Sequence, residues 1–148
     1  MDSKARRSTL AGLLILTLSA CGAGDGTNEQ AASSPVAAAV PGVVAVGADG
    51  VQELTIQVSD DYVFTPATVT VAPGPVRLTV QSVADELTHG FRFTPGGNPQ
   101  EIPEEISVIG PGRSETVEFE ADEPGEYLFD CSFHIGMGQT GVMTVTPK

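Results

Sequence analysis

Short runs in which apolar and polar residues alternate, separated by glycine and proline, fill the last two thirds of this 148-residue chain. The period of two is clear from Leu54 to Val58, from Val69 to Val71 and from Val76 to Val80, and it predicts short strands with one buried face. Similar runs contain Phe91, Val117, Phe129 and Met143. No window of helical length carries apolar residues at spacings of three and four. We therefore expect an all-β fold, a Greek-key β-sandwich or barrel of about seven to eight strands.

The first 20 residues have the layout of a secretory signal. Three basic residues precede an apolar stretch from Leu10 to Leu18, which is too short to remain in a bilayer as a spanning helix. The segment Leu18-Ser19-Ala20-Cys21 resembles the lipobox of bacterial lipoproteins, and the resemblance implies cleavage before Cys21 and lipid attachment to its sulfur. We expect a protein anchored by lipid to the cell membrane on the extracytoplasmic side, either periplasmic or on the outer face.

The remainder of the chain divides into a tether and a folded domain. Residues 21–50 are mostly alanine, glycine, serine, proline and valine without sustained periodicity. This composition favours a flexible linker. The expected organisation is a signal peptide over 1–20, a lipidated tether over 21–50 and a domain over 51–148, which is long enough for one small core.

Two histidines and one cysteine of the expected domain are candidate metal ligands. His89 and His134 are the only histidines in the chain, and Cys131 lies three residues before His134. With lipid on Cys21, Cys131 has no partner for an intramolecular disulfide. Alternation places His89 and Cys131 on the apolar faces of their strands. Either residue alone is more often part of a core, but a thiolate with two imidazoles is the ligand set of a mononuclear copper site.

Five motifs follow one another along the domain: Tyr62-Val63-Phe64-Thr65-Pro66, Val69-Thr70-Val71-Ala72-Pro73-Gly74, Thr88-His89-Gly90-Phe91, the stretch from Gly125 to His134, and Gly141-Val142-Met143-Thr144-Val145. Their order resembles that of the cupredoxins, the blue copper proteins. The resemblance implies one type 1 copper ion with His89, Cys131 and His134 in its equatorial plane. It also implies an electron carrier and not an enzyme, and two histidines are too few for an oxygen-reducing copper cluster.

The resemblance leaves the axial copper ligand open between Met137 and Gln139. A thioether is the commoner axial ligand, and Gly136 and Gly138 allow the loop around Met137 to adapt. Gln139 stands two residues before Gly141, which is the usual axial position in the family, and glutamine is an axial ligand in stellacyanin-type proteins. Met137 is expected slightly ahead of Gln139.

The charge of the chain bears on its partners. Without residues 1–20, the seven basic residues become four and the nineteen acidic residues become eighteen, a formal net charge of -14. This charge disfavours nucleic acid and anionic lipid head groups. It promotes solubility, and it also suits a basic redox partner, for which the acidic stretch from Glu101 to Glu126 offers a docking place.

We expect a membrane-tethered copper protein that carries single electrons between extracytoplasmic redox partners. Two alternatives stay open. One is a copper-binding or delivery protein that holds Cu(I) for another cuproprotein, and the other is a degenerate cupredoxin that serves as an interaction module.

Overall fold

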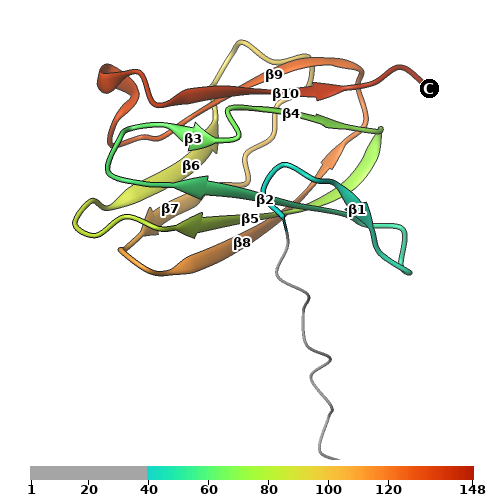
Figure 1. The fold of residues 1–148 in the computed structure, drawn as a ribbon. Coiled ribbons are helices and arrows are strands. Elements are labelled where there is room, and N and C mark those ends of the chain that lie inside the picture. The colour runs from blue at the N-terminus through green and yellow to red at the C-terminus, as the bar shows by residue number, and fades with distance from the viewer. Residues whose placement is uncertain (1–39) are drawn as a thin grey trace, which may run out of the picture. The chain divides into compact units, whose positions relative to one another are not determined.

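The computed structural model describes residues 40–148, which form a β-sandwich (Figure 1). Its strands are β1 (Ala45–Val46), β2 (Gln52–Val58), β3 (Phe64–Thr65), β4 (Thr68–Val71), β5 (Gly74–Ser82), β6 (His89–Phe93), β7 (Ile106–Ile109), β8 (Ser114–Ala121), β9 (Gly125–Asp130) and β10 (Thr140–Val145). The helical element of this region is a single 3-10 turn, η1 (Ile135–Met137). Within the described region no helix is long and apolar enough to cross a membrane. The predicted signal peptide, Cys21 and most of the predicted tether lie outside the described residues.

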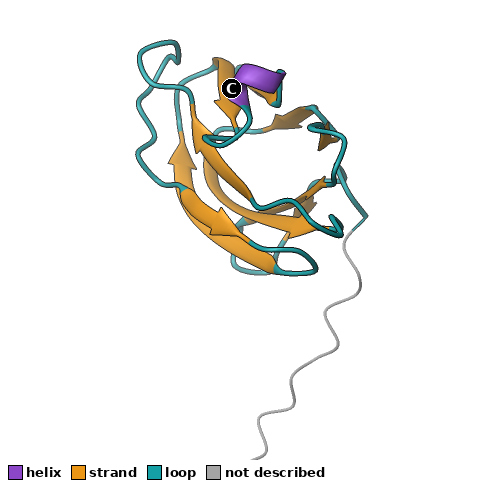
Figure 2. Cartoon of the chain, turned by 90° about the vertical axis from the view of Figure 1, so that its left-hand side faces the viewer, coloured by secondary structure: helices purple, strands orange, loops and turns teal. Residues whose placement is uncertain are grey.

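The strands form two sheets, which Figure 2 shows as two facing layers. One sheet has the order β1-β2-β5-β8, with β3 paired to β2, and the other has the order β4-β10-β9-β6-β7. The β2–β5 and β4–β10 pairs are parallel, and the remaining pairs are antiparallel. Four of the eight pairs join strands that are not consecutive, namely β2–β5, β5–β8, β4–β10 and β6–β9, so the chain crosses repeatedly between the layers. The expected all-β sandwich is confirmed.

The strand count exceeds the expected seven or eight because two strands are very short. β1 and β3 contain two residues each, which is too few for alternation to be visible. β1 lies within the segment predicted as a tether, where it pairs with β2 through Ala45 and Glu53. The Gly42 N–H also donates to the Thr55 carbonyl at 2.9 Å. The chain therefore joins the sandwich before residue 51.

The core lies between the sheets and consists of the residues that alternation places inward. Val76, Leu78 and Val80 of β5 are at most 1% exposed. At one end of the core the rings of Phe64, Phe91 and Phe129 pack against one another, with ring centroids 5.2 to 6.2 Å apart. Edge-to-face and tilted contacts of this kind stabilise aromatic clusters beyond the burial of their area. The candidate ligands lie next to this aromatic cluster in sequence, since His89 is two residues before Phe91 and Cys131 is two residues after Phe129.

Three loops meet at one end of the sandwich. β2, β5 and β9 end, and β6 and β10 begin, at the same end of the sandwich, on the left in Figure 1. The loops over residues 59–63, 83–88 and 131–139 are therefore neighbours, although they are far apart in sequence. This end of the molecule carries the candidate site.

Candidate metal centre

The three ligand candidates converge at one point. The Nδ1 or Nε2 atoms of His89 and His134 and the Sγ of Cys131 all lie within 4.8 Å of one another. His89 opens β6 and Cys131 directly follows β9, and both side chains are fully buried. His134 lies on the loop after Cys131 and is half-buried. The inward orientation expected from alternation is thus present on both strands.

The loop that follows Cys131 folds back on itself. The Cys131 carbonyl accepts from His134 N–H at 3.0 Å, and the His134 carbonyl accepts from Met137 N–H at 2.8 Å and from Gln139 N–H at 3.2 Å. Gly138 closes the turn with φ of 88°, a left-handed conformation that glycine adopts without steric cost. Cys131 N–H then donates to the Gln139 carbonyl at 3.1 Å. The loop therefore returns Gln139 to a position opposite Cys131.

The side chain of Gln139 reaches the three ligand candidates. It is fully buried, and its Oε1 lies 3.0 Å from Nδ1 of His89 and 3.1 Å from Nδ1 of His134. Nδ1 of His134 lies in turn 3.6 Å from Sγ of Cys131. One thiol, two imidazoles and one amide oxygen thus surround a common point.

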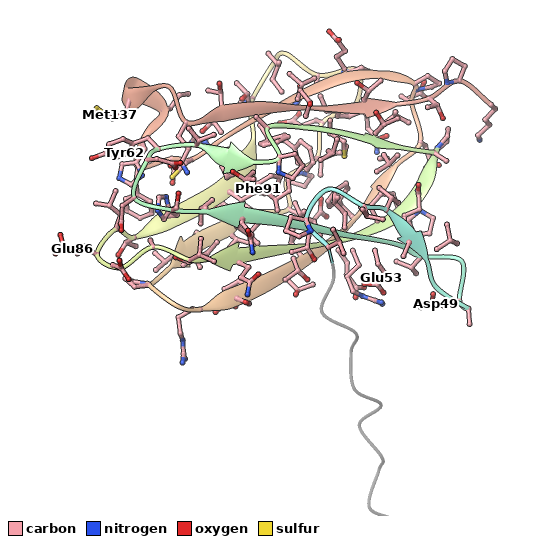
Figure 3. The ribbon with its side chains drawn as sticks, in the orientation of Figure 1. Asp49, Glu53, Tyr62, Glu86, Phe91 and Met137 are labelled. Atoms are coloured by element: carbon pink, nitrogen blue, oxygen red, sulfur yellow. The ribbon has the colours of Figure 1, made fainter. Side chains whose placement is uncertain are left out.

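Met137, the other axial candidate from the sequence, lies away from this point. Its side chain is 63% exposed and extends outward from the loop at the left of Figure 3. The cause is the pairing of β9 with β10, in which Thr140 is opposite Asp130. One residue beyond this pair, Gln139 lies opposite Cys131, and the Cys131 N–H donates to the Gln139 carbonyl. The strand pairing therefore brings Gln139 to the site, whereas Met137 lies in the turn and is exposed to solvent.

The sulfur of Cys131 accepts a hydrogen bond from the Gly90 N–H at 3.3 Å. A side chain at residue 90 would be crowded, because a Cβ there would lie 3.1 Å from the Ile106 carbonyl oxygen and 3.2 Å from the Ser132 hydroxyl. The backbone of β6 thus approaches the thiol closely.

The loop before His89 is held by Asp60, a residue that the sequence analysis missed. Its carboxylate accepts from the backbone N–H groups of Asp85 at 2.8 Å, Glu86 at 3.3 Å and Leu87 at 2.9 Å. These hydrogen bonds, above all the one from Asp85, hold the pKa of Asp60 below its usual value. Asp60 therefore fixes the segment that leads into a ligand. The run of polar turn residues after β2 is the one sequence signal that could have indicated it.

A second carboxylate, Asp130, lies beside the site and was also missed. It is fully buried and accepts from Nε of Arg92 at 2.9 Å and from the Thr94 hydroxyl at 2.8 Å. Alternation predicts that the side chain of Asp130 points away from the core. It is buried there all the same, in contact with the long side chain of Arg92. The pair joins the end of β9, immediately before Cys131, to β6.

The residues present fit a copper ion. Burial is the main cause that holds the pKa of His89 below its usual value, which favours the neutral imidazole that binds metals. Nδ1 of both histidines, Sγ of Cys131 and Oε1 of Gln139 face one another, and each of these atoms has lone pairs that a metal ion can accept. A soft thiolate with imidazoles is a donor set for copper.

A thiol held between two imidazoles at the end of a β-sandwich defines a mononuclear metal-binding domain. The sequence profile of the cupredoxin-like domain matches residues 13–145, and this chain belongs to that family. The cofactor expected from the sequence, one type 1 copper ion, agrees with the family and with the donor set.

Individual relatives carry the same fold. A plastocyanin of Nostoc punctiforme is 33% identical over 91 residues, which cover 55% of this chain and 63% of the plastocyanin. The match thus spans less than two thirds of that relative. The dithionite-reduced auracyanin of Roseiflexus castenholzii has a TM-score of 0.56 at 26% identity, over 64% of this chain and 97% of the auracyanin. Auracyanin A of Chloroflexus aurantiacus, a "blue" copper protein, has a TM-score of 0.57 over 66% of this chain and 100% of its own, and at 17% identity it shows the fold alone.

The contacts of Asp60 generate a prediction about acid stability. A carboxylate whose pKa in the folded state lies below its unfolded value of about 4 stabilises the fold above that pH, and this contribution is lost as the pH falls through the folded-state pKa. We expect the metal-free Asp60→Asn variant to melt below the wild type at neutral pH, with a difference that shrinks towards zero in acid. Thermal melts across the acid range measure it.

Asp122→Asn serves as the control, because the Asp122 carboxylate is exposed and accepts no hydrogen bond from a described residue. Its melting temperature should follow that of the wild type at every pH. A difference for Asp60→Asn that is as large in acid as at neutral pH would contradict the assignment of Asp60 as a charged acceptor.

Proposed function

We propose that this chain is a membrane-tethered carrier of single electrons that works through one copper ion on the extracytoplasmic side. The observation that carries the proposal is the convergence of Cys131, His89, His134 and Gln139 on one point, with His134 only half-buried. A buried donor set with one ring near the surface suits exchange of electrons and not of substrates.

Bound copper supplies a one-electron couple between Cu(II) and Cu(I). The protein supplies a fixed set of donors. His89 is the first residue of β6. Cys131 directly follows β9, and its N–H donates to the Gln139 carbonyl. Neither side chain is exposed to solvent. Donors that hardly move between the two oxidation states keep the reorganisation small, which favours fast transfer.

Apolar side chains near His134 support a contact face for a partner. Val63, Phe133, Ile135 and Met137 are between 44% and 63% exposed, and they lie on the two loops that flank the half-buried ring. Large exposed apolar groups gathered in one place commonly mark an interaction site. Contact there would bring a partner's redox group close to His134.

Acidic residues at the same end support a partner of positive charge. Asp60, Asp61, Asp85 and Glu86 are all exposed, and Figure 3 shows Glu86 at the same end as Tyr62 and Met137. The sequence analysis favoured the stretch from Glu101 to Glu126, of which the middle part forms β8 at the edge of the other sheet. We now favour the ligand end, because charges beside the contact face steer a partner directly to it.

One observation favours copper delivery as a second candidate function. The thioether of Met137 is exposed on the ligand loop, and soft sulfur ligands select Cu(I). A delivery protein would bind Cu(I) there or at the buried site and release it to another protein, without a stable Cu(II) form.

The proposed function predicts a blue protein. We expect the chain loaded with Cu(II) to absorb strongly in the visible range through charge transfer from the Cys131 thiolate, and the Cys131→Ser variant to lose this band. Absorption and electron paramagnetic resonance spectra measure both. The wild type reduced to Cu(I) is the control, because it keeps Cys131 and should be colourless. A wild type that binds only Cu(I) would contradict electron transfer and favour delivery.

The same protein tests the charge of the partner. Oxidation of the Cu(I) form by cationic metal complexes should be faster than by anionic complexes of equal driving force, and added salt should reduce the difference. Equal rates for the two kinds of oxidant would contradict the steering role of the acidic residues.

The axial ligand generates a separate prediction. We propose that Gln139 is the axial ligand, because its Oε1 is the only described side-chain oxygen placed between both rings. Loss of an oxygen donor disfavours Cu(II), so Gln139→Leu should raise the reduction potential by at least about 60 mV, a tenfold change in preference for Cu(I). Met137→Leu is the matched control and should leave the potential within about 20 mV of the wild type. A shift in Met137→Leu alone would reverse the assignment.

The tether is tested on the full-length gene product. If Cys21 carries lipid, the wild type should sediment with membranes, and Cys21→Ala should move to the soluble fraction with its copper site intact. Immunoblots of the two fractions measure the distribution. Retention of Cys21→Ala in the membrane fraction would contradict a lipid anchor at this residue.

A further inference from the structure

Tyr62 has a backbone conformation that is rare for its residue type. Its φ is 60°, and it is the one residue other than glycine with positive φ among residues 40–148. Large side chains rarely adopt the left-handed region, because Cβ crowds the backbone there. Backbone strain of this kind persists where the surroundings enforce it and often accompanies function.

The turn around Tyr62 is built to enforce this conformation. Oδ1 of Asp61 accepts from the Val63 N–H at 3.0 Å and from the Ser59 hydroxyl at 2.7 Å, which closes the turn on both sides of Tyr62. The neighbouring Asp60 is fixed by its three backbone hydrogen bonds to the loop before His89. The turn thus cannot relax without losing several hydrogen bonds.

The strained turn places the ring of Tyr62 against His134. The two ring centroids are 4.9 Å apart with an interplanar angle of 66°, an edge-on contact. The His134 ring also contacts the ring of His89, at 5.0 Å and 67°. Figure 3 shows Tyr62 at the same end of the sandwich as Met137. The ring of His134 therefore packs against two other rings.

The contact depends on the ring of Tyr62 and not on its hydroxyl. No described residue forms a hydrogen bond with the hydroxyl of Tyr62, and the nearest comparable ring, Phe133, is more distant at 6.3 Å from His134 and itself 51% exposed. His89 and Cys131 are immobilised by burial, whereas His134 is half-buried on a loop. His134 is thus the ligand whose position most needs an additional support.

We propose that Tyr62 is a positioning residue that keeps the His134 ring in one orientation in both oxidation states of the site. The inference rests on the proposed electron-transfer function. The two oxidation states of copper prefer different ligand distances, so a ligand that is able to swing would move at each transfer and slow it. Contacts with the rings of both Tyr62 and His89 restrict that movement.

Three substitutions separate the ring from the backbone conformation. Tyr62→Gly and Tyr62→Asn remove the ring and put residue types that tolerate positive φ in its place. Tyr62→Phe keeps the ring and is the matched control. Because the first two variants relieve strain while losing one surface contact, we expect their metal-free forms to melt within about 5 °C of the wild type.

The first measurement needs no metal. Diethyl pyrocarbonate modifies neutral imidazoles that are accessible, and His89 and His134 are the only histidines, so mass spectrometry of the peptides distinguishes them. In metal-free Tyr62→Gly and Tyr62→Asn the modification rate of His134 should rise about fivefold, which corresponds to about 1 kcal/mol of lost restraint on the ring. Tyr62→Phe should match the wild type.

The second measurement uses the copper-loaded full-length chain. The rate constant for electron self-exchange, obtained from nuclear magnetic resonance line broadening, should fall about tenfold in Tyr62→Gly and Tyr62→Asn and stay within about twofold in Tyr62→Phe. The reduction potential should rise in the first two variants, because a mobile His134 lets the site relax around Cu(I).

Unchanged modification and self-exchange rates in Tyr62→Gly would overturn the inference, and so would a Tyr62→Phe variant that behaves like Tyr62→Gly. These outcomes leave the proposed function intact if the wild type is blue and reversibly reduced. A wild type that forms no blue Cu(II) species refutes the proposed function instead, whatever the Tyr62 variants do.

Discussion

The antiparallel pairing of β9 with β10 is the constraint on which the metal centre depends. With Thr140 opposite Asp130, the positions at the end of the ladder are Cys131 and Gln139, and the connecting loop has to turn between them. That turn carries His134. A shift of this register by one residue would direct Cys131 out of the core, because side chains alternate between the faces of a strand. Three of the four groups at the site therefore follow from one strand pairing.

The site is inserted into the end of a hydrophobic core, and this position has an energetic consequence. Phe64, Phe91 and Phe129 close the space beneath the ligands. In these apolar surroundings Nε2 of His89 and Nε2 of Gln139 have no hydrogen-bond partner in the described region. Burial of polar groups without partners costs free energy, of order 1–3 kcal/mol each. A metal held by the thiol and the imidazole nitrogens that face each other would bind only the folded chain, so metal binding would stabilise the fold.

The segments around the site differ in the number of hydrogen bonds that fix them. Asp60 ties the turn after β2 to the loop that leads into His89, and Asp130 with Arg92 ties β9 to β6 just before Cys131. These carboxylates brace the backbone on both sides of the buried ligands. The half-buried His134 lies on the loop after Cys131, where its Nδ1 faces Gln139 and its ring contacts the rings of Tyr62 and His89. The least buried of the three ligand candidates is thus the one that lies on a loop and not at the end of a strand.

The sequence by itself determined the fold class and three of the residues at the site. Alternation is a local property of the chain, so it identified the buried faces of the longer strands and showed that His89 and Cys131 point inward, and the ordered motifs added His134. Only the tertiary structure placed Gln139 beside the two histidine rings and Met137 in solvent, because these positions depend on the register of two strands and on a left-handed glycine in the turn. The same holds for Asp60, Asp130 and Tyr62. Each acts on residues at least 25 positions away or across the sandwich, and no local pattern encodes which distant segments a folded chain brings into contact.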